Sequence, residues 1–204
     1  GLLSKLSNSH SSVFYTRLSF EDMSVISGLF DTLEKAIEES RLVQFFHKNQ
    51  YRLVKPYRVV SFDGYWYLLC EEVIDGRIKT FHIARMKDLC LHEDHFEKDT
   101  TLAKRLDKAI NAWFNPNVEP YEVILEISAE IKRYMLDHPI APTQKIVQEL
   151  ACGTFYLSLE ITNEKEILST IFKWIPHIRV IAPKALQESV LLQTKAFLEK
   201  QVLL

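Results

Sequence analysis

Basic side chains are concentrated in one segment of the sequence. Between Arg41 and Lys87 there are nine lysines and arginines against four acidic residues, a local charge of +5 in a chain whose net charge is −2. The remaining residues therefore carry −7, and any attraction to an anion is local to this segment. Such a cluster, with His47 and His82 inside it, can bind a phosphate or a nucleic-acid backbone. The alternative is that these cations only keep the edges of strands soluble.

Aromatic rings cluster in the same segment, directly behind the turn signal Asp63-Gly64. Residues 65–70 read "YWYLLC". Side chains alternate between the two faces of a strand, so Trp66 and Leu68 share one face and Tyr67 lies on the other. We expect Trp66 and Leu68 in a core, and Tyr67 on a face where its hydroxyl meets a ligand or a polar partner. Burial in a core on both faces is the alternative.

Other reactive residues lack the spacing that catalysis or metal binding requires. His92 and His95 stand three apart, whereas the helical zinc-protease motif needs four. No nucleophile-elbow, phosphate-loop or dinucleotide motif occurs, and Cys152 has no evident base. The pair Glu71-Glu72 is interpreted as a solvated strand end. We therefore expect no enzyme, no cofactor and no metal. The three cysteines lack any paired spacing, which is typical of the reducing cytoplasm.

A helix and five short strands are expected to position the basic segment. Apolar residues recur at helical spacing over about residues 20–40. Strand-like runs follow at 42–47, 51–62, 65–72, 77–84 and 88–92. Two Asp-Gly pairs, at 63–64 and 75–76, predict hairpin turns, and Pro56 predicts a bend or an edge in the second strand. Strands this short and closely spaced indicate a small, strongly bent sheet or a barrel.

The second half of the chain predicts a separate domain. A helix is expected over 99–114, and the breaker sequence "NPNVEP" at 115–120 indicates a boundary. Strands are expected at 121–127, 144–150, 154–162 and 178–182, with helices at about 128–137 and 164–175. This is the βαββαβ order of a ferredoxin-like domain, and Pro183 predicts one more helix after it. The sequence thus predicts an α+β protein.

Two segments together resemble the WYL domain of bacterial transcriptional regulators: "PYRVVSFDGYWYLLC" and "GRIKTFHIARM". A proline-ended strand, a glycine, the Trp-Tyr-Leu triplet and a later basic segment follow in the order of that family. The resemblance covers about residues 20–202. It implies a leading helix and a small SH3- or Sm-like β-barrel at 20–98, a connecting helix and linker at 99–120, and a ferredoxin-like C-terminal extension at 121–204.

The resemblance also implies a site for a ligand. By position, Arg52, Arg85 and the triplet at 66–68 match residues of the family. His47 stands where tyrosine is usual, Lys79 and His82 where arginines are usual, and Ala84 where aspartate is common. The cationic replacements keep hydrogen-bond donors, although lysine loses the bidentate geometry of arginine. The residues expected to bind the ligand are His47, Arg52, Tyr67, Lys79, His82 and Arg85.

Members of the family usually carry an N-terminal helix-turn-helix that binds DNA. Residues 1–19 are serine-rich and begin without methionine, so we interpret them as the linker from such a domain. The hypothesis is an effector-sensing, dimerising part of a cytoplasmic transcriptional regulator that forms a homodimer and binds a nucleotide or a short single-stranded nucleic acid. Two alternatives stay open: a constitutive dimerisation scaffold, or direct binding of single-stranded RNA or DNA by the barrel.

Overall fold

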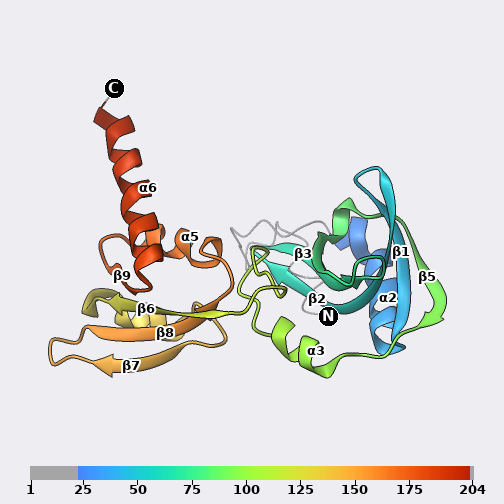
Figure 1. Ribbon diagram of the computed structural model, residues 1–204, viewed down its shortest axis with the longest axis horizontal. Coiled ribbons are helices and arrows are strands. Elements are labelled where there is room, and N and C mark those ends of the chain that lie inside the picture. Colours follow the sequence, from blue (N-terminus) through green and yellow to red (C-terminus); the bar gives the residue numbers. More distant parts are fainter. Residues whose placement is uncertain (1–22, 203–204) are drawn as a thin grey trace, which may run out of the picture. The chain divides into compact units, whose positions relative to one another are not determined.

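The computed structural model describes residues 23–202, so the linker predicted at 1–19 lies outside the described residues. It has mixed α+β architecture and divides into two compact units, one ending at Leu106 and one beginning at Asp107 (Figure 1). Each unit contains one antiparallel sheet. The α+β prediction is therefore confirmed.

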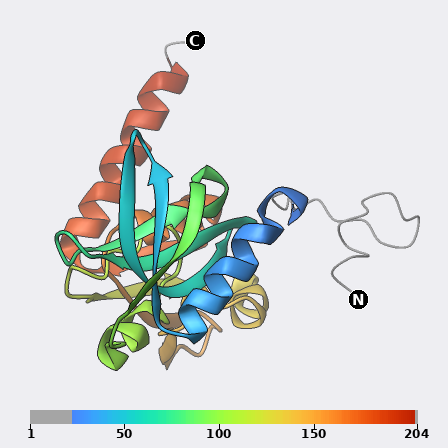
Figure 2. The same ribbon diagram turned by 90° about the vertical axis from the view of Figure 1, so that its right-hand side faces the viewer.

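The described part of the first unit, from Met23 on, contains two helices, five strands and one 3-10 turn. In chain order they are α2 (Met23–Glu38), β1 (Arg41–His47), β2 (Gln50–Phe62), β3 (Tyr65–Glu72), β4 (Ile78–His82), η1 (Ile83–Arg85), β5 (Lys87–His95) and α3 (Thr100–Leu106). The strands are ordered β4-β3-β2-β1-β5. Helix α2 packs against β1, β2 and β5 (Figure 2).

Local turn chemistry explains the hairpins of this sheet. Lys48 and Asn49 join β1 to β2, and Asp63 and Gly64 join β2 to β3, and all four residues have positive φ. Two-residue turns of this kind match the right-handed twist of the strands. The hairpin predicted at Asp63-Gly64 is confirmed. The register shifts beside Pro56, where β2 bends.

One face of the sheet, here called the inner face, carries the core of the first unit. Its buried residues include Val43, Phe45, Val54, Leu68 and Phe81. Apolar residues of α2 cover them, in keeping with the helical periodicity of that segment: Ile26, Leu33 and Ala36. Trp66 packs against the same core and meets the ring of Phe30 edge-on at 4.9 Å. The core positions predicted for Trp66 and Leu68 are thus confirmed.

Three details of the first unit differ from the predictions. The described sheet is not a closed barrel, because β4 and β5 are the two ends of its strand order. The strand predicted at 77–84 ends at His82, since η1 turns the chain and buries Ile83. The helix predicted at 99–114 ends at Leu106: Leu102 and Leu106 are buried, but Ile110 packs against the core of the second unit, which interrupts the helical stripe.

The second unit has the element order that its sequence predicts. Its elements are β6 (Tyr121–Ile127), η2 (Ala129–Ile131), α4 (Lys132–Asp137), β7 (Lys145–Glu149), β8 (Phe155–Ile161), α5 (Lys165–Lys173), β9 (Ile178–Ala182) and α6 (Lys184–Val202). The sheet order is β7-β8-β6-β9. Alternate residues of β6 and β8 are buried under α5, as expected for strands with one face on a core.

Helix α6 begins on this sheet and then leaves it. Leu186 is buried, and Val190 packs against the core. The helix extends away from its own sheet toward its C-terminal end (Figure 1), and its large apolar residues after Val190 are more than half exposed. These residues are Leu191, Leu192, Phe197 and Leu198.

Candidate functional site

Register places three of the six predicted ligand residues on the inner face. Arg52 pairs with Phe45 across β1 and β2, Lys79 pairs with Cys70 across β3 and β4, and His47 follows Phe45 by two residues. Because Phe45 and Cys70 are core residues, their partners point to the same side of the sheet. His47, Arg52 and Lys79 therefore extend one end of the inner face.

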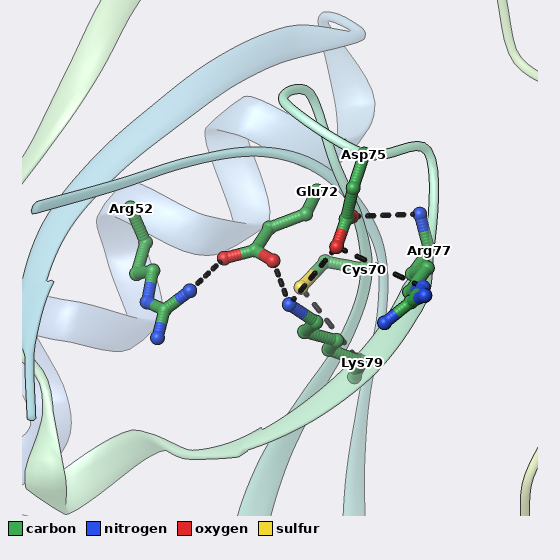
Figure 3. A network of polar contacts seen from close by, with 6 residues as sticks. All are labelled: Arg52, Cys70, Glu72, Asp75, Arg77 and Lys79. Carbon is green, nitrogen blue, oxygen red and sulfur yellow. Dashed lines mark hydrogen bonds and ion pairs between the residues drawn. The ribbon is translucent and has the colours of Figure 1, made fainter.

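A buried carboxylate already binds two of these cations. Glu72, at the end of β3, is only 1 % exposed. Its Oε1 lies 2.5 Å from Nη1 of Arg52, and its Oε2 accepts a hydrogen bond from Nζ of Lys79 (Figure 3). The Arg52 and Lys79 side chains are 18 % and 32 % exposed. One carboxylate thus bridges two cations that reach solvent more than it does.

Asp75 adds a second negative charge beside Lys79. Its Oδ2 lies 3.5 Å from Nζ of Lys79, and its Oδ1 accepts a hydrogen bond of 3.0 Å from the backbone N–H of Arg77 (Figure 3). That backbone hydrogen bond, helped by the charge of Lys79, lowers the pKa of Asp75. The charges of Arg52 and Lys79 are therefore balanced by those of Glu72 and Asp75.

His47 offers a polar atom that this network does not use. Its Nδ1 is buried and has no hydrogen-bond partner among the described residues. Its ring meets Phe81 edge-on at 5.1 Å. Burial lowers the pKa of His47, and the charges of Lys48, Arg52 and Arg85 lower it further. The imidazole is therefore neutral at pH 7, with one nitrogen able to donate or accept a hydrogen bond.

The remaining predicted residues lie elsewhere on the domain. Tyr67 and His82 are directly paired across β3 and β4, with ring centroids 5.3 Å apart, on the face opposite the core. Tyr65 and Phe62 flank this pair at 5.5 and 5.8 Å. Arg85 is exposed in η1, where its charge acts on His47. The structure thus separates the predicted residues into an inner group with Arg52, Lys79 and His47 and an outer pair.

Glu72 is the polar residue that sequence reasoning missed. It was interpreted with Glu71 as a solvated strand end, and for Glu72 that interpretation is wrong. Glu71 lies on the outer face, where its Oε1 is 2.6 Å from Nζ of Lys55. Strand periodicity could have found the difference, because Leu68, Cys70 and Glu72 fall on one face.

Ion pairs neutralise much of the basic excess in this segment. At least five of the nine cations lie within 4.0 Å of a carboxylate: Arg41, Arg52, Lys55, Arg77 and Lys79. The local charge of +5 therefore overstates the attraction that an anion meets. Near the inner group, Lys48 and Arg85 still place positive charge beside the neutral His47.

Each of the two units matches a known domain family. Residues 28–91 match the WYL domain, and residues 119–198 match the WCX domain. The chain contains a WYL domain followed by a WCX domain. This confirms the resemblance found in the sequence, and the WCX domain lies where a C-terminal extension was expected. Glu72, Arg52 and Lys79 are residues of the WYL domain, and the exposed part of α6 belongs mainly to the WCX domain.

Solved structures resemble the chain at low sequence identity. One is the proteasome accessory factor B/C (PafBC) of Arthrobacter aurescens, with 17% identity and a TM-score of 0.36 over 80% of this chain and 25% of that one. Another is described as a CRISPR Cas-related protein, with 13% identity and a TM-score of 0.53 over 87% of this chain and 53% of that one. The chain therefore spans about a quarter and about half of these proteins. No curated protein matches it.

The part of the chain that the structure describes contains neither a metal-binding cluster nor a helix that could span a membrane. Residues 23–202 contain no group of three or more His, Cys, Asp or Glu placed to hold a metal ion. No helix in that range is both long and apolar enough to cross a membrane. Among the cysteines, Cys70 is buried, which raises the pKa of its thiol and makes the reactive thiolate scarce.

Proposed function

We propose that this chain is the effector-sensing part of a bacterial transcription regulator, and that its WYL domain binds a phosphate-bearing ligand. The observation that carries the proposal is the succession of a WYL and a WCX domain in one chain, with two cations and an unpartnered imidazole nitrogen at one end of the WYL inner face. The finer fold description is part of the same proposal: an open, bent sheet related to the Sm-like fold, followed by a ferredoxin-like unit.

The chemistry of the inner group suits a phosphate. Arg52 and Lys79 supply charge-assisted hydrogen bonds, and phosphate oxygens are acceptors that suit them. His47 adds a neutral donor or acceptor beside them. Holding a phosphate requires neither a nucleophile nor a general base, so the proposed role of these residues is binding and not catalysis. Cytoplasmic location follows from that role in regulation.

A nucleotide and an oligonucleotide are expected to use the domain differently. Strand β4 is an edge strand that presents Lys79 on the inner face and His82 on the outer face. A chain-like ligand can pass around this edge and stack a base on Tyr67 and His82, whereas a mononucleotide reaches only one group. Binding of the ligand would change the affinity of a DNA-binding domain for DNA only if the regulator has two conformational states that bind the ligand with different affinities.

Titration with two probes tests the proposal. Adenosine diphosphate and a fluorescein-labelled oligothymidylate of about ten nucleotides are added to the chain, and affinity is followed against salt concentration. Arg52→Ala with Lys79→Ala is expected to weaken binding of whichever probe binds at least about tenfold, and Lys55→Ala, which removes a cation from the outer face, less than about threefold. Equal effects of the variants would refute the site. Absence of binding of both probes would refute it too, if it persists after Glu72→Gln removes the charge of the buried carboxylate.

The exposed apolar residues of α6 favour a second role in dimerisation. Leu191, Leu192 and Phe197 are 63%, 70% and 59% exposed, which is unusual for a helix in a monomer. A homodimer, with or without ligand sensing, would bury them. Light scattering of the chain and of Leu192→Glu over a range of concentrations tests this role, because the variant is expected to dissociate a dimer that uses this surface.

A further inference from the structure

We infer that Glu72 occupies the anion site of the WYL domain as an internal counter-ion, and that a phosphate-bearing ligand binds by displacing it. This inference rests on the proposed function and names how its site is regulated. The two cations expected to bind the ligand, Arg52 and Lys79, are the two that bind the Glu72 carboxylate, one on each oxygen (Figure 3). A phosphate can replace the carboxylate on both donors.

The burial of Glu72 supports a competing role. At 1 % exposure the carboxylate is desolvated and depends on its two cations, while both cations retain contact with solvent. An incoming phosphate can therefore reach Arg52 and Lys79 from the solvent side. It meets Glu72 as a like charge at short range, which disfavours simultaneous binding of both anions.

The backbone around Glu72 restricts the change to its side chain. Its N–H donates to the carbonyl of Arg77 at 2.9 Å, and its own carbonyl accepts from the N–H of Gly76 at 2.9 Å. These bonds close the turn between β3 and β4. Displacement therefore requires rotation of the Glu72 side chain and no opening of the sheet.

A neighbouring residue provides a matched control. Glu71 is the penultimate residue of β3 and also forms an ion pair, with Lys55, but on the outer face. Glu71→Gln and Glu72→Gln remove the same charge one residue apart. Any effect of net charge on the binding of an anion is common to both variants, so a difference between them reports on the Arg52 and Lys79 site.

The experiment measures the affinity of adenosine diphosphate and of the labelled oligothymidylate for the whole chain and its variants. We expect Glu72→Gln to bind at least one probe about tenfold more tightly than wild type, and Glu71→Gln to change affinity less than about threefold. Glu72→Asp keeps the charge but shortens the side chain, so we expect an intermediate gain. With the oligonucleotide, Glu72→Gln should also steepen the salt dependence by about one phosphate contact.

Each outcome decides one of the two proposals. Wild-type binding that Glu72→Gln leaves unchanged or weakens would overturn the displacement of Glu72 while preserving the proposed function. A gain of equal size in Glu71→Gln would overturn it too. Binding of a probe by Glu72→Gln and not by wild type supports displacement, and absence of binding by every variant refutes the proposed function itself. If Glu72→Gln fails to fold, Glu72→Asp is compared with Glu71→Asp, and a gain in affinity that is absent or equal in the two variants would overturn the displacement.

Discussion

The ion pair between Arg52 and Glu72 should be energetically coupled much more strongly than the pair between Lys55 and Glu71. Two unit charges about 4 Å apart attract by about 4 kcal/mol at the effective dielectric of a protein surface, and desolvation offsets part of this. The Arg52 and Glu72 side chains are 18 % and 2 % exposed, against 31 % and 19 % for Lys55 and Glu71. We expect coupling of about 2 kcal/mol for the first pair and about 0.5 kcal/mol for the second.

Two double-mutant cycles measure these couplings. Each partner is replaced by glutamine singly and together, and unfolding in urea gives the free energy of each variant. Trp113 and Trp174 are replaced by phenylalanine in every variant, so that tryptophan fluorescence follows the unfolding of the first unit through Trp66 alone. Equal couplings in both cycles, or a coupling below about 0.5 kcal/mol for Arg52 and Glu72, would show that burial does not strengthen the ion pair of Glu72 with Arg52.

The remaining predictions concern pH, a helix start and the core. Because folding lowers the pKa of His47, the unfolded chain binds more protons at this residue. The free energy of unfolding is therefore highest above pH 6.5, which is about the pKa of histidine in the unfolded chain, and it falls as the pH drops below that value. His47→Gln should lose less thermal stability than wild type between about pH 7.5 and pH 5.5, and an equal loss would contradict this. Glu166→Ala should lower the free energy of unfolding in urea by about 2 kcal/mol, because the buried Oε1 of Glu166 accepts hydrogen bonds from the backbone N–H groups of Thr162 and Asn163. The control is the same substitution at the exposed Glu160, and equal losses at the two positions would refute the argument. Leu68→Ala should cost about 3 kcal/mol by the cavity it leaves, and a cost under about 1 kcal/mol would place Leu68 outside the core.

Local patterns predicted most elements of the fold because their causes are local. Alternation in β3 separated Trp66 and Leu68 from Tyr67, and the Asp63-Gly64 pair specified the turn that precedes them. The helix predicted at 99–114 was wrong beyond Leu106, since the packing of Ile110 on another core is invisible to a periodic pattern. Closure of the sheet depends on strand ends that periodicity does not fix.

The candidate site was predicted less completely than the fold. The residue types were found, and Tyr67 and His82 do lie together, but Arg52 and Lys79 lie on the other face. The prediction of a single site did not take into account that side chains alternate between the two faces of β4. Lys79 and Phe81 point to the inner face, and His82 points to the outer face.

The sequence by itself determined which side chains share a face, where the turns lie, and that cations are dense between Arg41 and Lys87. Only the tertiary structure decided which of those cations are neutralised. Arg52 and Glu72 are 20 residues apart and meet because the pairing of β2 with β3 sets Val54 against Glu72, so that the carboxylate enters the inner face. Burial and charge pairing depend on strand register, and register joins residues whose distance in sequence carries no sign of their contact.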